Sequence, residues 1–87
     1  MASQEIRAAV KDYIMEEFLP GEDPATVSDS TALLSEGILD SIATIKLAAW
    51  LEDHYGIELE AHEMSVDNLD SIAAIAAIVT SKLEARG

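Results

Sequence analysis

The 87-residue sequence contains no cysteine. Disulfide bonds, thiolate nucleophiles and thiolate metal ligands are therefore excluded, and any thiol chemistry needs a group added to the chain. Aromatic residues are also scarce, with one Trp, two Tyr and one Phe, although 49% of the residues are hydrophobic. A core made mainly of Ile, Leu, Val and Ala is typical of packed helices.

Basic residues are few as well. Five Lys and Arg stand against 17 Asp and Glu, which gives a formal net charge of -12 and a pI near 4.1. Because this balance repels phosphate backbones and anionic lipid surfaces, we expect neither nucleic acid nor a membrane as a partner. The same charge steers a small protein toward basic patches on other proteins.

Long apolar runs are missing. No stretch reaches the roughly 20 apolar residues of a membrane span. The first ten residues, which include Glu5 and Arg7, lack the apolar segment of a signal peptide. We therefore expect a cytoplasmic protein. The length is too short for two independent domains, so we expect residues 1–87 to form a single domain that acts as a monomer.

The first part of the chain combines a helical pattern with a long irregular stretch. Apolar residues at steps of three and four predict a helix from residue 3 to about residue 19, which Pro20 and Gly21 end. Residues 21–37 show no sustained helical period and predict a long loop. Three apolar residues favour a loop pinned onto the rest of the protein, with a short buried turn around residues 32–34: Val27, Leu33 and Leu34.

A second helix is predicted from Ser41 to Tyr55, with Asp40 as its N-cap and Gly56 as its C-terminal stop. A step of about 100° per residue places one group of residues on the core side: Thr44, Leu47, Ala48, Leu51 and Tyr55. The opposite side is a mixed outward face: Ile42, Lys46, Ala49 and Asp53. Trp50 lies between the two sides. We expect it to pack against a short third helix, with a partner contact as the alternative.

The last part of the chain predicts one further long helix. A turn or short helix near residues 61–66 leads to a helix over about residues 69–84. Six residues supply its buried face: Leu69, Ile72, Ile75, Ala76, Val79 and Leu83. These elements predict an all-α four-helix bundle with three long helices, one short helix and a long loop between the first two helices.

The segment before the second helix carries the chemical motif. Residues 37–42 read Gly-Ile-Leu-Asp-Ser-Ile, which places Ser41 at the start of that helix. A helix N-terminus presents unpaired N–H groups and a partial positive charge, and both suit a phosphodiester. Asp-Ser-Ile recurs at residues 70–72, and Asp-Ser occurs at residues 29–30. Ser41 differs from these because a glycine-containing loop end precedes it and an exposed apolar residue follows it. A plain helix-capping role for Ser41 is the alternative.

These residues resemble the attachment site of acyl and peptidyl carrier proteins, in which a serine after an aspartate opens the second helix. The resemblance extends over almost the whole chain, including the long first loop, residues 47–57 and residues 68–72. It implies a non-catalytic carrier that holds an acyl or aminoacyl group as a thioester. The group would be held on 4'-phosphopantetheine, transferred from coenzyme A and attached covalently to Ser41. In that family the preceding aspartate, here Asp40, lies close to the metal of the transferase, and Ser71 falls at a helix start with a packing role.

The resemblance also implies the partners: a phosphopantetheinyl transferase, an adenylating or acyl-transfer loading enzyme, and downstream biosynthetic enzymes. We expect these enzymes to dock on the outward face formed by Ile42, Lys46, Ala49 and Asp53. The Gly-Ile-Leu-Asp-Ser segment is similar to that of D-alanyl, aminoacyl and freestanding secondary-metabolism carriers. Carriers of fatty acid synthesis have an acidic second helix, whereas this chain has Ala43 and Lys46 at those surface positions. We therefore expect a dedicated loading enzyme and no role in fatty acid elongation.

Other classes of function have less support from the residues. An unmodified small acidic interaction module needs only an exposed stripe, and it stays the alternative to a carrier. We expect no catalytic residues, because the chain lacks a Gly-x-Ser-x-Gly motif and has two histidines. We expect no metal site, because His54 and His62 have no third ligand at zinc spacing and the acids do not follow the order of a calcium loop.

Overall fold

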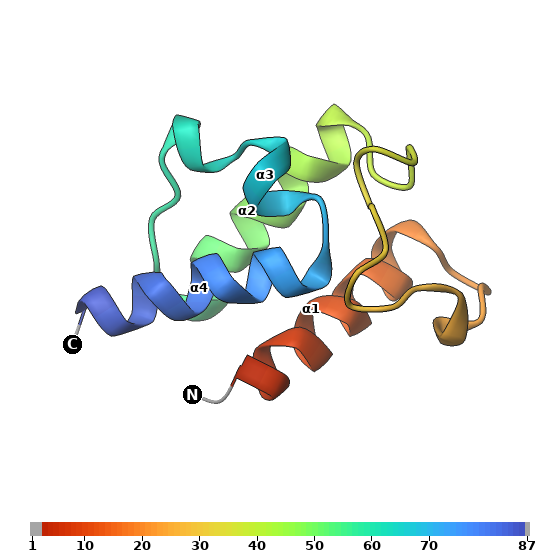
Figure 1. Cartoon of the computed structure of the whole chain (residues 1–87), viewed down its shortest axis with the longest axis horizontal. Coiled ribbons are helices and arrows are strands. Elements are labelled where there is room, and N and C mark those ends of the chain that lie inside the picture. Colours follow the sequence, from red (N-terminus) through yellow and green to blue (C-terminus); the bar gives the residue numbers. More distant parts are fainter. Residues whose placement is uncertain (1–2, 87) are drawn as a thin grey trace.

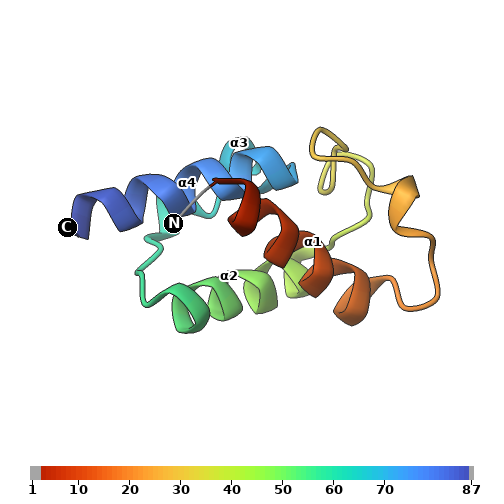
Figure 2. The same ribbon diagram turned by 90° about the horizontal axis from the view of Figure 1, so that it is seen from below.

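The computed structural model describes residues 3–86, with the backbone alone for residues 3, 66, 67 and 86. Its regular elements are all helical. The long helices are α1 (Ser3–Phe18), α2 (Ser41–Tyr55) and α4 (Ile72–Arg86), and the short helix is α3 (Val66–Leu69). Two 3-10 turns cover Pro24–Thr26 and Ala61–Glu63. Figure 2 shows α1 lying obliquely across α2 and α4, and Figure 1 shows α3 beside the first half of α4. The predicted arrangement of three long helices and one short helix is confirmed.

The core lies between the three long helices and is aliphatic. Helix α1 contributes Ile6, Val10 and Ile14, all fully buried. The predicted core side of α2 is buried throughout, and the predicted face of the last helix is buried except for Leu83, which is half-buried. Burial of these aliphatic side chains contributes about 1.5–3 kcal/mol each relative to exposure, which makes them the main source of stability.

Both ends of α2 follow from local chemistry. The Asp40 side chain accepts a hydrogen bond from the Ala43 N–H at 2.7 Å, which makes Asp40 the N-cap. Gly56 ends the helix in the left-handed conformation, with φ at 64°, and its N–H donates to the Glu52 carbonyl. Glycine adopts this conformation without a Cβ clash. The predicted first and last residues of α2 are therefore confirmed.

The last helix begins later than predicted. Leu69 is buried as expected, but it ends α3, and α4 begins at Ile72. Two polar residues, Asp70 and Ser71, separate the two helices because their side chains bond to backbone N–H groups instead of continuing one helix. The hydrophobic period continues across this break, so periodicity alone could not reveal it.

The long loop between α1 and α2 is fastened to the helices. The Asp29 carboxylate pairs with Arg7 of α1 at 3.3 Å, and the Asp29 carbonyl accepts from the Ala73 N–H of α4 at 3.0 Å. Val27 and Leu33 are buried, as the prediction of a pinned loop requires. The turn covers residues 33–37, slightly later than the predicted residues 32–34.

Trp50 packs against α1, so the expected contact with the short third helix is wrong. Its ring stacks on Tyr13 of α1 with the centroids 4.4 Å apart and the planes 13° apart. His54 also stacks on Trp50, with the ring centroids 4.8 Å apart. The angular position of Trp50 on α2 could be predicted from the sequence, but the neighbour at that angle depends on the packing of α1. Among the described residues, no helix is long and apolar enough to cross a membrane.

Candidate functional site

Ser41 is the first residue of α2, and its side chain is exposed. No hydrogen bond joins its hydroxyl to any residue that the structure describes. Asp40, and not Ser41, caps the start of the helix. Its carboxylate accepts a hydrogen bond from the Ala43 N–H, and its carbonyl accepts from the N–H and the hydroxyl of Thr44 at 2.9 and 2.8 Å. Because Asp40 is the cap, the adjacent Ser41 hydroxyl is left available.

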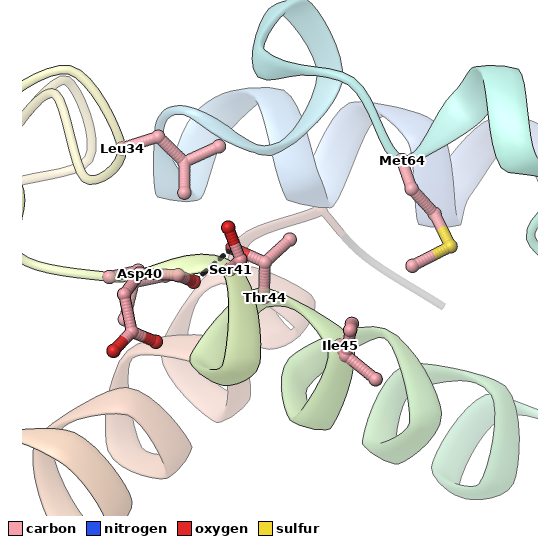
Figure 3. Close-up of a pocket in the computed structure, with 7 residues that line it drawn as sticks. Leu34, Asp40, Ser41, Thr44, Ile45 and Met64 are labelled. Carbon is pink, nitrogen blue, oxygen red and sulfur yellow. Dashed lines mark hydrogen bonds between the residues drawn. The ribbon is translucent and has the colours of Figure 1, made fainter.

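An open pocket of about 550 Å³ lies beside Ser41 (Figure 3). Leu34 of the long loop and Met64, which follows the second 3-10 turn, lie across the pocket from Ser41. The complete lining is Leu34, Leu39, Asp40, Ser41, Thr44, Ile45 and Met64. Residues from three separate parts of the chain therefore form a recess with both apolar and polar walls next to the Ser41 hydroxyl.

Two exposed isoleucines flank Ser41 on α2. Ile42 is 66% exposed and Ile45 is 61% exposed. Ile45 lines the pocket beside Ser41, whereas Ile42 lines a second open pocket of about 300 Å³ between α2 and the end of α1. Large exposed apolar side chains at one place indicate a surface that a partner covers. Ile45 was not among the outward residues predicted from the sequence. Its angle on α2 could not have identified it, because Ala43 lies at a similar angle from the core side, on the opposite flank, and is buried.

The structure places all four residues of the outward face at the surface. Ile42, Lys46, Ala49 and Asp53 are exposed along one side of α2 that begins next to Ser41. Ala43 differs from what we expected. It is 9% exposed and belongs to the core, because the side of α2 on which it lies faces α1. Of the two positions at which we expected a difference from fatty acid carriers, only Lys46 is on the surface.

The second Asp-Ser-Ile has a different geometry. Asp70 Oδ1 accepts from the N–H groups of Leu34 and Ser35 at 2.7 and 2.9 Å, and Oδ2 accepts from the Ser35 hydroxyl at 2.7 Å. Hydrogen bonds from Ser35, and then the one from Leu34, lower the pKa of Asp70. Ser71 Oγ accepts from the Ala74 N–H at 3.1 Å and so caps α4. Both polar side chains of this triplet are already engaged.

The remaining motif residues show no comparable site. The Ser30 hydroxyl lies in the exposed loop, 3.3 Å from that of Ser28. Glu60, His62 and Glu63 bring their ligand atoms within 4.8 Å of one another at the surface. Glu63 is bonded to Lys82, and the hydrogen bond from that lysine lowers the pKa of Glu63. Glu63 is half-buried and engaged by Lys82, while Glu60 and His62 are exposed.

Comparison with known proteins agrees with this geometry. Residues 4–79 match the family model described as "Phosphopantetheine attachment site". D-alanyl carrier protein 2 of Lactiplantibacillus plantarum (strain ATCC BAA-793 / NCIMB 8826 / WCFS1) is 32% identical over 81 residues, which cover 93% of this chain and 98% of the relative. The solved structure of KstB-PCP in its apo form has a TM-score of 0.68 and 29% identity, over 92% of this chain and 88% of that chain.

The chain belongs to the family of phosphopantetheine-binding carrier proteins. It is a non-catalytic carrier with a phosphopantetheine attachment site. Membership of this family implies a phosphopantetheinyl transferase and loading enzymes as partners in general.

Proposed function

We propose that Ser41 is the residue that receives 4'-phosphopantetheine from coenzyme A. The observation that carries the proposal is the difference in hydrogen bonding between the Ser41 and Ser71 hydroxyls. Ser41 is exposed and has no hydrogen bond to a described residue, whereas Ser71 caps α4. A nucleophilic hydroxyl has to reach the active site of a transferase, so Ser41 fits this role and Ser71 does not.

The transfer is a displacement at phosphorus. Ser41 Oγ forms a bond to the phosphorus that bears the pantetheine, and the bond from that phosphorus to the bridging oxygen of coenzyme A breaks. Adenosine 3',5'-bisphosphate leaves, and the hydroxyl proton passes to a base of the transferase. The first N–H groups of α2 have no partner within the helix and favour a negative group at this position. Once attached, the arm supplies the thiol that this chain lacks, and that thiol can hold the cargo as a thioester.

The test is the intact mass after incubation with coenzyme A and a broad-specificity phosphopantetheinyl transferase. We expect one added arm on the parent protein and none on Ser41→Ala. Ser71→Ala and Ser30→Ala are the matched controls, since each removes another serine that follows an aspartate, and both should gain the arm. If the parent protein is not modified, the result would instead support an unmodified small acidic interaction module. If Ser41→Ala still gains the arm, the attachment site is another residue.

For the cargo, we propose an aminoacyl or related acyl group delivered by a dedicated adenylating or acyl-transfer enzyme. The similarity to a D-alanyl carrier protein and to KstB-PCP supports this class. Exposed Lys46 supports it as well, because it puts a positive charge where a basic partner surface would be repelled. The finished thioester would pass to downstream biosynthetic enzymes, as in natural product pathways.

Two loading reactions distinguish the cargo classes. The holo protein is offered D-alanine and ATP with an adenylating enzyme that loads a D-alanyl carrier protein, and separately malonyl-coenzyme A with a malonyl transferase of fatty acid synthesis. We expect a larger fraction of the carrier to be loaded in the first reaction, read from the intact mass. Lys46→Glu should improve the second reaction, most strongly at low ionic strength, since surface charges act mainly on association and are screened by salt. Efficient malonyl loading of the parent, unchanged by Lys46→Glu, would contradict the dedicated pathway.

The docking face for these enzymes is proposed to be the outward side of α2, with Ile42, Lys46, Ala49 and Asp53. Two observations support this docking face: all four residues are exposed, and Ile42 is large and apolar. Function as a single monomeric domain of residues 1–87, located in the cytoplasm, stays a prediction.

A further inference from the structure

One carboxylate holds the long loop against the start of α4. Three of the bonds to Asp70 use its side chain, which accepts from Leu34 N–H, Ser35 N–H and Ser35 Oγ–H. A fourth bond runs from the Leu33 N–H to the Asp70 carbonyl. Three consecutive loop residues are therefore bonded to a single residue far away in the sequence. Hydrogen bonds to an ionised carboxylate are stronger than those between neutral groups.

The loop residues held by Asp70 lead directly to the pocket beside Ser41. Leu34, whose N–H is bonded to Asp70, is one wall of that pocket. The Leu39 N–H donates to the Leu33 carbonyl at 3.0 Å, which ties the segment just before Asp40 to the same turn. Asp70 itself does not line the pocket. Any influence on Ser41 has to act through the position of the loop.

We propose that Asp70 is a positioning residue for recognition of the carrier. It fixes the turn of residues 33–35, so that an enzyme that approaches Ser41 meets Leu34 already in place. If the turn were free, the partner would have to order it on binding, and that entropy cost would weaken the complex. The inference rests on the proposed function of Ser41 as the modified residue.

The first test measures the loop directly and does not depend on which serine is modified. Hydrogen exchange of backbone amides is compared in the parent, Asp70→Ala and Ser71→Ala. In Asp70→Ala we expect the Leu34 and Ser35 amides to exchange at least about tenfold faster, with the amide of Ile14 in the core of α1 unchanged. Ser71→Ala removes the neighbouring helix cap but leaves the carboxylate in place, so its loop amides should exchange as in the parent. Unchanged loop exchange in Asp70→Ala would overturn the proposal.

The second test separates recognition from chemistry. The apo variants are modified by a broad-specificity phosphopantetheinyl transferase at several carrier concentrations. Asp70→Ala should raise the KM for the carrier about three- to tenfold and leave kcat within about twofold, because the reacting hydroxyl is untouched. Ser71→Ala should keep the parental KM. A parental KM for Asp70→Ala, or an equal rise for Ser71→Ala, would show that Asp70 has only a structural role.

Two milder variants keep the test valid if Asp70→Ala does not fold. In Asp70→Asn the amide oxygen can still accept from both backbone N–H groups, so the KM should fall between those of the parent and the alanine variant. Ser35→Ala removes one bond from the other side and should shift the KM by a smaller amount in the same direction. No shift in either variant would also overturn the proposal. Modification of Ser41→Ala would instead contradict the proposed function, whatever the exchange data show.

Discussion

Asp40-Ser41-Ile42 and Asp70-Ser71-Ile72 contain the same three side chains, and each lies at the start of a long helix. In the first triplet the aspartate is the cap, the helix begins at the serine, and the isoleucine is 66% exposed. In the second the serine is the cap, the helix begins at the isoleucine, and that isoleucine is fully buried.

The two triplets therefore differ by a single residue in their register relative to the helix. That shift decides which polar side chain satisfies the first N–H groups, and so which one is left for another task. In the first triplet the free group is the Ser41 hydroxyl, whereas in the second it is the Asp70 carboxylate, which bonds to the loop. The same motif provides the proposed attachment site in one register and a structural anchor in the other.

The largest expected difference is between the two isoleucines. Ile72→Asp buries a charge in the core and should cost at least about 4 kcal/mol, which is a large part of the stability of a domain of this size. Ile42→Asp should change the free energy of unfolding by less than about 1 kcal/mol, because the side chain is exposed. It should nevertheless slow arm transfer and cargo loading. Urea unfolding and loading rates provide the measurements, and a protein unfolded by Ile42→Asp would place that residue in the core.

The alanines that follow the triplets sharpen the comparison. Ala43 is buried and Ala73 is exposed, the reverse of the isoleucines before them. Ala43→Asp should destabilise the protein by about 2–3 kcal/mol, whereas Ala73→Asp should stay within about 0.5 kcal/mol. Thermal or urea unfolding of the two variants measures the difference. Equal effects would mean that the two helices do not differ in register as described.

How much the sequence could predict depends on the range of the interactions. The bounds of α2 were predictable because Asp40 and Gly56 act on backbone groups within a few residues of themselves. The core side of α2 was predictable because helical geometry fixes the angles between its residues. Ser41 as the candidate site also follows from local features, namely its place at a helix start and the exposed residue beside it.

Contacts between distant segments were not predictable in this way. The bonds from Leu34 and Ser35 to Asp70 join residues 35–36 positions apart, and nothing local to either segment indicates them. Ala43 and Trp50 both face α1, but the angle of a residue on its own helix does not identify the neighbouring helix. The pocket beside Ser41 needs the loop, α2 and the segment with Met64 together, so it emerges only from the packed structure.

A smaller effect is expected from the serines themselves. Ser71→Ala removes the bond to the Ala74 N–H and should cost about 1 kcal/mol, as loss of a helix cap does. Ser41→Ala removes no bond to a described residue and should change the free energy of unfolding by less than about 0.5 kcal/mol, although we expect it to abolish modification. Chemical unfolding of both apo variants checks this, and a large loss for Ser41→Ala would give Ser41 a structural role.

The smallest effect is a dependence on pH. The pKa of Asp70 is lowered in the folded state by its hydrogen bonds from Ser35 and Leu34. Its contribution to stability is therefore fully present above the unfolded pKa of about 4 and is lost as the pH falls through the folded value. The stability difference between the parent and Asp70→Asn should shrink between pH 7 and the acid range. Urea midpoints across that range measure it, and a constant difference would contradict an ionised anchor.

The stacked rings of Tyr13, Trp50 and His54 have an optical consequence. Trp50 is the one tryptophan of the chain, and its indole stacks with a ring from α1 and with a ring from α2. The hydroxyl of Tyr13 also donates to the carbonyl of Lys46, on the helix whose outer side is the proposed docking face. The fluorescence of Trp50 should therefore change when a partner shifts α1 against α2. Association of this carrier with an enzyme can then be followed by tryptophan emission, without a dye.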